Sequence, residues 1–193
     1  MQNLQISENI VIVGGGPVGA TLALMLGQQG IKVTVLEARA KGAAYDEKRA
    51  LALSAGSREM LEKLGVWQQV KPSVTNINTI HISQHQHQLE ALGYVVYYGA
   101  LTQALDEALN KCPSIQFVYE AQAQKIAHHM DFSTVDFQQN NINQQLNSRL
   151  VVLADGGRSL DEIEGLTRET KAYGHDALIA KISAELPHNS IAY

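Results

Sequence analysis

The sequence is poor in cysteine, with Cys112 as the single one among 193 residues. One cysteine excludes a disulfide within the chain and favours a reducing compartment such as the cytoplasm. Basic residues are also scarce, since 15 lysines and arginines face 19 aspartates and glutamates, for a formal net charge of -4. Because nucleic-acid binding usually needs a basic surface, this balance argues against a nucleic-acid partner.

Long hydrophobic runs are lacking as well. The longest apolar run, residues 18–26, is too short to span a bilayer. The first nine residues are polar and include Glu8, so no signal peptide is expected. These absences predict a soluble protein of the cytoplasm.

Glycine, by contrast, is concentrated in one informative string, residues 13–19 (VGGGPVG). Gly14, Gly16 and Gly19 have the G-x-G-x-x-G spacing, between an apolar strand pattern and a helical pattern that begins at Pro17. The first glycine permits a tight turn, the second a close approach to a pyrophosphate, and the third close packing of helix and strand. The N-terminus of the helix presents N–H groups and a partial positive charge to phosphates. The string therefore predicts a dinucleotide site, against the alternative of a glycine-rich turn without a ligand.

The strand that follows the helix ends in an acidic residue. Residues 33–37 read as a buried strand ending at Glu37, whose carboxylate could accept hydrogen bonds from a ribose and would repel a 2′-phosphate. FAD or NAD is therefore favoured here over NADP. The alternative for Glu37 is an exposed strand end.

Further elements follow from hydrophobic periodicity and turn residues. Helices are predicted over residues 57–64 and 101–109, and strands over 74–87, 115–119 and 177–183. A hairpin is predicted to join residues 134–138 to 146–154 around Asn140 and Asn141.

Two further strings carry a resemblance to a known family. Residues 49–54 (RALALS) and 154–159 (ADGGRS) resemble motifs of the flavin aromatic hydroxylases, specifically the polyprenyl-methoxyphenol hydroxylases of ubiquinone biosynthesis. In that family the arginine, here Arg49, lies against the FAD pyrophosphate, and an aspartate usually stands where this chain has Glu47. The resemblance implies cofactor contacts from Asp155 and Gly156, although Asp-Gly is also a common turn. Together with the glycine string, the predicted cofactor-binding residues are Gly14, Gly16, Pro17, Gly19, Glu37, Ala38, Arg39, Arg49, Asp155 and Gly156.

The resemblance implies a fold and its division along the chain. The expected fold is a doubly wound, Rossmann-like α/β FAD-binding domain of the aromatic hydroxylase type, with part of a β-rich substrate domain. Residues 1–73 and 99–172 would form the FAD-binding domain. Residues 74–98 and 173–193 would belong to the substrate domain, which would be incomplete.

The resemblance also implies a reaction, the hydroxylation of a polyprenylated phenol ring in ubiquinone biosynthesis. FAD would be the cofactor, NAD(P)H the reductant and O2 the source of the inserted oxygen. Other enzymes of the pathway and the surface of the inner membrane are implied as contacts. No catalytic residue is assigned.

Departures from the family pattern leave other functions open. The family's third motif, which holds the ribityl chain, is missing, and members have a second half about as long as this chain, so a truncated chain is expected. The alternatives are an NAD-dependent oxidoreductase and a non-catalytic nucleotide-binding fragment. His81, His85 and His87 would share one face of a strand, but a solvated strand is favoured there over a metal site.

Overall fold

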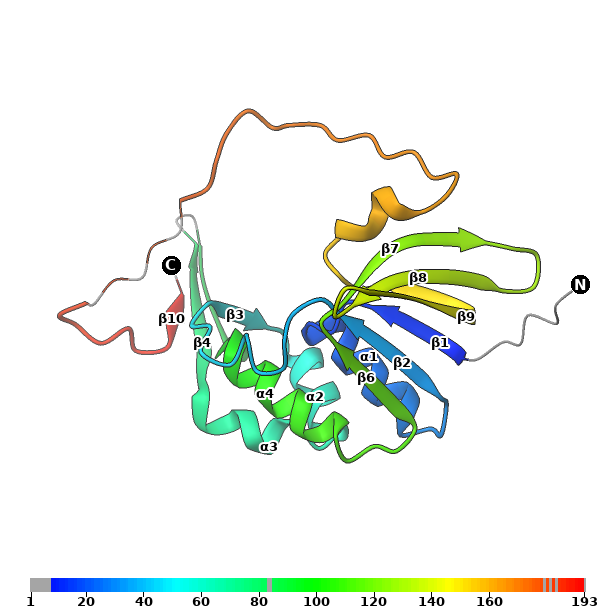
Figure 1. Ribbon diagram of the computed structural model, residues 1–193. Coiled ribbons are helices and arrows are strands. Elements are labelled where there is room, and N and C mark those ends of the chain that lie inside the picture. The colour runs from blue at the N-terminus through cyan, green and yellow to red at the C-terminus, as the bar shows by residue number, and fades with distance from the viewer. Residues whose placement is uncertain (1–7, 83–84, 179, 181, 183, 193) are drawn as a thin grey trace, which may run out of the picture.

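The computed structural model describes residues 8–82, 85–178, 180, 182 and 184–192, with side chains described except at 8–9, 80–92 and 192. The strands form one six-stranded and one four-stranded sheet. In Figure 1 the two sheets lie on either side of the molecule, with the helices below and between them.

The six-stranded sheet has the order β6-β2-β1-β9-β8-β7. Four of its strands run parallel, namely β1 (Glu8–Val13), β2 (Val33–Glu37), β6 (Ile115–Tyr119) and the end of β9 (Ile142–Leu153). The strands β7 (Ala121–His128) and β8 (Ser133–Gln139) continue it as an antiparallel meander. The predicted Rossmann-like α/β fold is confirmed.

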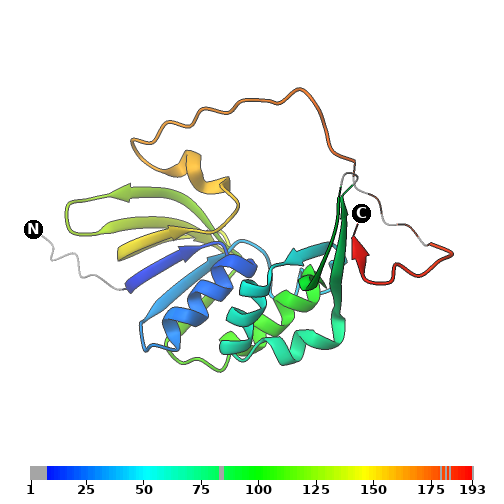
Figure 2. The same ribbon diagram turned by 180° about the vertical axis from the view of Figure 1, so that it is seen from behind.

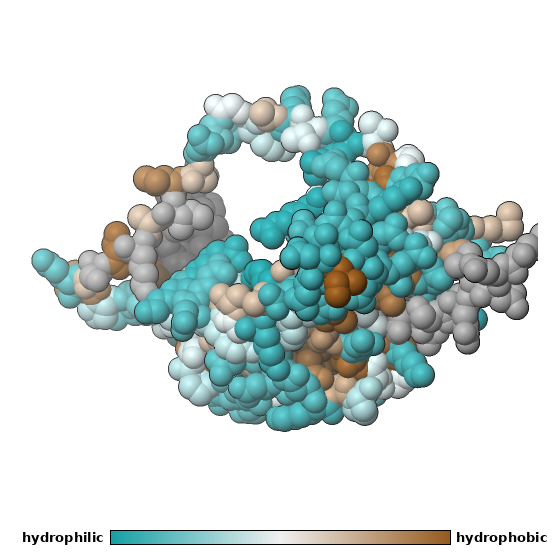
Figure 3. All heavy atoms as spheres, in the orientation of Figure 1, coloured by the Kyte–Doolittle hydropathy of each residue, from teal (hydrophilic) through white to brown (hydrophobic). Residues whose placement is uncertain are grey.

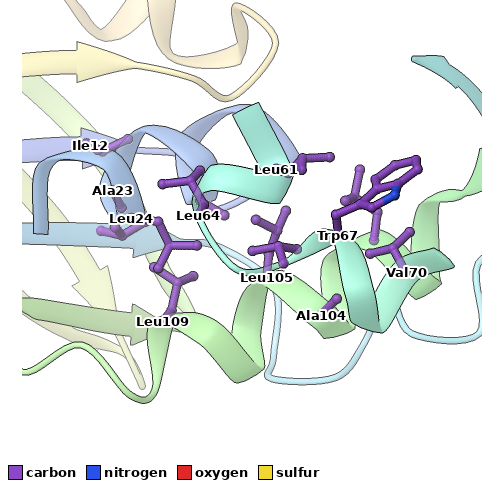
Figure 4. Close-up of a cluster of buried hydrophobic side chains, with 14 of the residues drawn as sticks. Ile12, Ala23, Leu24, Leu61, Leu64, Trp67, Val70, Ala104, Leu105 and Leu109 are labelled. Carbon is purple, nitrogen blue, oxygen red and sulfur yellow. The ribbon is translucent and has the colours of Figure 1, made fainter. Parts of the chain in front are cut away.

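Four helices accompany the sheets, namely α1 (Pro17–Gly27), α2 (Ala55–Lys63), α3 (Trp67–Val70) and α4 (Tyr98–Leu109), with a 3₁₀ turn, η1 (Lys71–Ser73), after α3. Figure 2 shows α1 in front of the strands of the larger sheet when the molecule is seen from behind. The helices bury their apolar side chains in one cluster with the sheet, which includes Leu24, Leu105 and Trp67 (Figure 4). This cluster ties α1 and α4 together at the centre of the molecule.

The other face of the six-stranded sheet has its own core. Side chains alternate along a strand, so Ile12 faces the helices while Val11 and Val13 face the opposite side, where they pack with Val135 and Phe137 of β8. Both faces of β1 and β2 are thereby buried, which explains their uninterrupted apolar sequences.

The four-stranded sheet has the order β10-β4-β5-β3. Its strands are β3 (Ala50–Leu53), β4 (Val74–Ile82), β5 (His85–Tyr97) and β10 (Ile191–Ala192). The described chain enters this sheet three times, from β2 into β3, after η1 into β4, and at the end into β10, and β5 leads directly back into α4. Two of the connections between the sheets are therefore the segment from β2 to β3 and the junction at which β5 leads into the N-terminus of α4.

Most predicted elements are present, with one clear error. The helices at 57–64 and 101–109, the strand at 115–119 and the hairpin around Asn140 and Asn141 are confirmed, and both asparagines have positive φ, as a two-residue turn requires. The segment predicted as one strand at 74–87 is extended but divided between two antiparallel strands, β4 ending at Ile82 and β5 beginning at His85. The strand predicted at 177–183 is wrong for its described residues, which have no regular structure. They belong to the long arch between η2 (Arg158–Glu162) and β10 in Figure 1. Leu178 is 97% exposed there, so its apolar pattern has no strand to pair with or core to enter.

The metal alternative at His81, His85 and His87 concerns side chains outside the described ones. Elsewhere in the described chain, no group of three or more histidine, cysteine, aspartate or glutamate side chains is arranged to hold a metal ion. Within the same described residues, no helix combines the length and hydrophobicity that crossing a bilayer requires. The face shown in Figure 3 is mostly hydrophilic, with hydrophobic residues gathered in its lower middle part.

Candidate functional site

A groove of about 570 Å³ opens where β1, β2 and β9 end. Carboxyl ends of parallel strands are where open α/β sheets bind ligands. Its walls come from the turn after β1, the segment after β2, the start of α4, the start of β7 and the turn after β9. The residues that line the groove include Gly14, Gly16, Pro17, Glu37, Ala38, Arg39, Glu47, Arg49, Tyr98, Asp155, Gly156 and Arg158.

The glycine string forms a tight turn between β1 and α1. Gly14 has a φ of +102°, and a Cβ placed on it would lie 2.6 Å from the carbonyl carbon of Ala154, so β1 and β9 could not both keep their places with a side chain there. A Cβ on Gly19 would collide with the carbonyl oxygen of Gly14. Gly19 therefore lies behind the groove and sets the distance between helix and strand rather than lining the surface.

The N-terminus of α1 points into the groove without a side-chain cap. Gly16 occupies the capping position and Pro17 is the first helical residue, so neither offers an acceptor to the N–H groups of the first turn. Those groups lack partners within a helix and carry its partial positive charge. The end of α1 is thus prepared to bind an anion, and a phosphate is the anion most often found at such helix ends.

Glu37 at the end of β2 is held by hydrogen bonds on both carboxylate oxygens. Its Oε2 accepts from the backbone N–H of Gly15 at 2.8 Å, and its Oε1 accepts from the backbone N–H of Arg39 at 2.9 Å. The Arg39 side chain adds an ion pair at 2.8 Å. Burial alone would raise the pKa of Glu37, but these hydrogen bonds outweigh it and hold the pKa below its ordinary value. Glu37 is therefore a fixed, ionised acceptor at the floor of the groove.

Two arginines lie beside this carboxylate. Arg39 donates through Nη2 to the hydroxyl of Tyr98 at 3.2 Å as well as pairing with Glu37, and the Glu37 hydrogen bond raises the pKa of Arg39 further above its ordinary value. Arg49 pairs with Glu47 at 3.1 Å, and its guanidinium carbon lies 4.4 Å from the centre of the Tyr98 ring. Ala38, between Glu37 and Arg39, lines the groove with no polar side chain.

The turn after β9 completes the groove on the far side. Asp155 accepts hydrogen bonds from the backbone N–H groups of Gly157 at 3.0 Å and Ser159 at 2.6 Å. Burial raises the pKa of Asp155, but the hydrogen bonds from Ser159 and Gly157 lower it more, so the group has a lowered pKa. Its carboxylate thus holds the turn that presents Gly156, whose φ is +74°, to the groove.

The structure brings the predicted residues together from three distant parts of the sequence. All of them except Gly19 line the groove. The lining residues Tyr98, Gln122 and Glu162 were not predicted from the sequence. Arg158 and Ser159 belong to the predicted string 154–159 but were given no role. Tyr98 carried no signal because it stands at the junction of a strand and a helix, where no motif or periodicity marks it.

The shape and chemistry of the groove fit a dinucleotide. An uncapped helix end and backbone glycines suit a pyrophosphate, and a carboxylate at the end of the second strand suits a ribose. Side chains on the glycines would close the turn, as the Gly14 geometry shows. These features agree with FAD as the bound group.

Comparisons with known proteins agree with this reading. The family model described as "FAD binding domain" matches residues 8–188. The chain is similar to the ubiquinone hydroxylase UbiL of Rhodospirillum rubrum, with 29% identity over 95% of this chain and 46% of that protein. It is also similar to the 3-demethoxyubiquinol 3-hydroxylase of Escherichia coli, with 29% identity over 91% of this chain and 48% of the relative. The chain thus spans about half the length of these curated relatives.

Solved structures share the fold. The p-nitrophenol 4-monooxygenase PnpA of Pseudomonas putida superposes with a TM-score of 0.67 at 22% identity, over 79% of this chain and 42% of that one. At that identity the likeness concerns the fold alone. The family model, by contrast, extends from the first strand to the arch before β10, and the groove lies within its range. The chain therefore belongs to the FAD binding domain family.

Proposed function

We propose that the chain is the cofactor-binding part of an FAD-dependent monooxygenase that hydroxylates the ring of a polyprenylated phenol in ubiquinone biosynthesis. The observation that carries the proposal is the groove itself, in a chain of this family, where the uncapped α1 N-terminus, Glu37 and the Arg49 guanidinium face one space. The ubiquinone hydroxylases among the relatives support the substrate class. NAD(P)H as reductant and O2 as oxidant are parts of the same proposal.

Each predicted residue has a role in this proposal. Gly14, Gly16 and Pro17 bring the N–H groups of the turn and of α1 to the pyrophosphate, and Gly19 keeps α1 close to β1. Glu37 accepts hydrogen bonds from the ribose of the adenosine. FAD, when bound, supplies the redox chemistry of the hydroxylation, whereas the protein supplies binding, orientation and the exclusion of water.

The remaining residues would complete the binding of FAD. Arg49 and Arg39 would place positive charge beside the phosphates and the adenosine, with Ala38 leaving room between them. Asp155 would hold the turn so that Gly156 approaches the cofactor with its backbone. We further propose that the four-stranded sheet belongs to the substrate-binding part of the enzyme, and that residues 74–98 and 173–193 contribute to it.

A polyprenyl substrate would dissolve in a bilayer, so contact with the inner membrane surface and with other enzymes of the pathway belongs to the proposal. A cytoplasmic protein bound to the membrane periphery would satisfy it. Sedimentation with lipid vesicles, with and without the polyprenylated phenol, tests this part separately.

The cofactor proposal is tested by titrating the purified chain with FAD and following flavin fluorescence, with ADP and NAD as competitors. We expect saturable FAD binding that ADP displaces and NAD displaces poorly. Tight NAD binding without FAD binding would instead favour an NAD-dependent oxidoreductase. Oxidation of NAD(P)H by the FAD-loaded chain, dependent on the phenol, then separates an enzyme from a fragment that only binds nucleotide.

A further inference from the structure

Tyr98 stands between two of the arginines that line the groove, Arg39 and Arg49. Its side chain is 7% exposed, so it forms a fixed wall at the start of α4. The Arg49 guanidinium lies over its ring at 4.4 Å from the centre, within cation–π range, while Arg39 donates to its hydroxyl at 3.2 Å. One side chain therefore contacts two of the three arginines that line the groove, Arg39 and Arg49, the third being Arg158.

The backbone reinforces this arrangement. The Tyr98 N–H donates to the carbonyl oxygen of Arg49 at 2.8 Å, so the two residues are joined through the main chain as well as through ring and guanidinium. A Cβ on Gly16 would lie 3.3 Å from the Tyr98 hydroxyl, which places that hydroxyl close to the uncapped end of α1. Tyr98 thus connects the arginines to the proposed phosphate site.

The charges of Arg39 and Arg49 are each paired with a carboxylate. Arg39 is paired with Glu37 and Arg49 with Glu47, each two residues earlier, so each cation is largely balanced by its own neighbour. Arg49 is also 60% exposed along its side chain, and an exposed arginine loses rotamer entropy when it binds. A diphosphate would therefore gain most from arginines that are already oriented.

We propose that Tyr98 is a positioning residue of the cofactor site, whose ring holds Arg49 in the orientation in which its guanidinium meets the diphosphate of the dinucleotide, while its hydroxyl fixes Arg39. The inference rests on the proposed function, in which this groove binds FAD. It assigns to Tyr98 a role in affinity through Arg49, without a contact of its own to the reacting atoms.

The test is a double-mutant cycle in FAD affinity between Tyr98 and Arg49. Tyr98→Phe keeps the ring and should bind within about threefold of the wild type, whereas Tyr98→Leu removes the ring and should weaken binding by about tenfold. Arg49→Gln should cost clearly less in the Tyr98→Leu background than alone, because its guanidinium is then no longer held. The dependence of affinity on salt should fall in Tyr98→Leu as it does in Arg49→Gln, since both remove a positioned cation.

Tyr97→Leu is the matched control, because Tyr97 precedes Tyr98 at the end of β5 and does not line the groove. Equal affinity in Tyr98→Leu and wild type, or additive effects of the two substitutions, would overturn the positioning role. Absent FAD binding in the wild type would overturn the proposed function and this inference with it, so the two failures are distinct. Should Tyr98→Leu not fold, Tyr98→Met takes its place in the cycle, because methionine also lacks the ring and adapts to the space it leaves. Additive effects of Tyr98→Met and Arg49→Gln would likewise overturn the positioning role.

Discussion

Glu37 is the residue on which the contacts of the groove converge. It ends a buried strand, accepts from the turn at Gly15, and pairs with Arg39. A carboxylate with this many donors is already oriented before a ribose arrives, which reduces the entropy lost on binding. Its ionised state is therefore part of the fold as well as of the site.

The pH dependence of stability should reveal this ionised state. Because the pKa of Glu37 in the fold lies below its ordinary value of 4.5, the carboxylate stabilises the protein above that pH, and the stabilisation disappears as the pH falls through the folded-state pKa. Glu37→Gln should cost ~1 kcal/mol of unfolding free energy near neutrality, and this difference should shrink in acid. Urea unfolding at a series of pH values measures it.

Glu107→Gln provides the control for this series, because Glu107 is an exposed carboxylate on α4. Its unfolding free energy should follow the wild type at every pH. A Glu37→Gln difference that stayed constant into acid would contradict an ionised, hydrogen-bonded Glu37.

Gly16 is the second residue whose substitution is informative. Its added side chain would point toward the Tyr98 hydroxyl and the space in front of α1, so Gly16→Val should abolish FAD binding while the protein stays folded. Fluorescence titration and circular dichroism check the two halves of this prediction. Gly56→Ala, in the first turn of α2, where an added Cβ would meet only the Ser54 hydroxyl at 3.9 Å, should leave affinity unchanged and stabilise the helix by up to ~1 kcal/mol. Wild-type affinity in a folded Gly16→Val protein would refute the site.

At the scale of elements, the segment between β2 and β3 is held on α4. The Tyr45 hydroxyl donates to Asp106 at 2.8 Å, and the Gly99 N–H donates to the Glu47 carbonyl at 3.0 Å. Burial, then the hydrogen bond to Asp106, raises the pKa of Tyr45 to about 12. The anchor therefore fixes the segment that carries Arg39 and Arg49.

Asp106 itself is buried on α4. Substituting it distinguishes the effect of its hydrogen bonds on stability from the effect of its buried charge. Burial raises its pKa, although hydrogen bonds from Tyr45 and Tyr119 oppose the rise. A raised pKa means that the contribution of Asp106 to stability is present below its ordinary value of 3.8 and is lost as the pH rises through the folded-state pKa. The ionised form therefore costs stability at neutral pH.

We expect Asp106→Asn to be at least as stable as the wild type at neutral pH, because it keeps an acceptor for Tyr45 and removes the buried charge. Asp106→Ala should lose ~1–3 kcal/mol, since both tyrosine hydroxyls lose their acceptor, and should also weaken FAD binding as the anchored segment loosens. Thermal unfolding and FAD titration of both variants measure these effects. Equal stability of the asparagine and alanine variants would contradict the anchor.

The elements also show how far sequence alone reaches. The β1–α1–β2 unit was predictable because glycine spacing, an apolar strand and Glu37 all specify it locally. β3 and β7 were not predicted. β3 has only four residues and pairs with β5, far along the chain, so only the tertiary fold identifies it. Tyr98 was missed for the same reason, since only the tertiary fold brings Arg39 and Arg49 to its two contacts. The strand predicted at 177–183 was wrong because an apolar periodic pattern indicates a preference for burial but does not show that a partner strand is present.

At the scale of the whole molecule, one groove connects the six-stranded sheet with the segments that lead to the four-stranded sheet. Arg49 directly precedes β3 and Tyr98 directly follows β5, while Gly14 and Asp155 follow strands of the larger sheet. A ligand in the groove would therefore contact segments that adjoin strands of both sheets. Binding should stabilise the molecule globally rather than locally.

This global effect is measurable as a shift in unfolding. FAD at a hundredfold excess over its dissociation constant should add ~2.7 kcal/mol to the unfolding free energy, provided the unfolded chain does not bind it. Both sheets should melt together at the higher temperature. Gly16→Val should show no shift with FAD, whereas an equal shift in that variant would indicate binding elsewhere on the molecule.

The pairing of β1 with β9 determines when, during synthesis and folding, the groove can form. Val13 pairs with Leu153, and the Ala154 N–H donates to the Val13 carbonyl at 2.7 Å, so the glycine turn and the Asp155 turn meet only after the chain has been synthesised beyond Asp155. Contacts between residues so far apart in sequence form slowly, because loop-closure entropy must be lost before they are made. An emerging chain therefore carries its glycine string long before it can retain FAD. FAD could therefore bind in the groove only once the chain has been synthesised beyond Asp155, and its binding would stabilise the β1–β9 pairing after that pairing has formed.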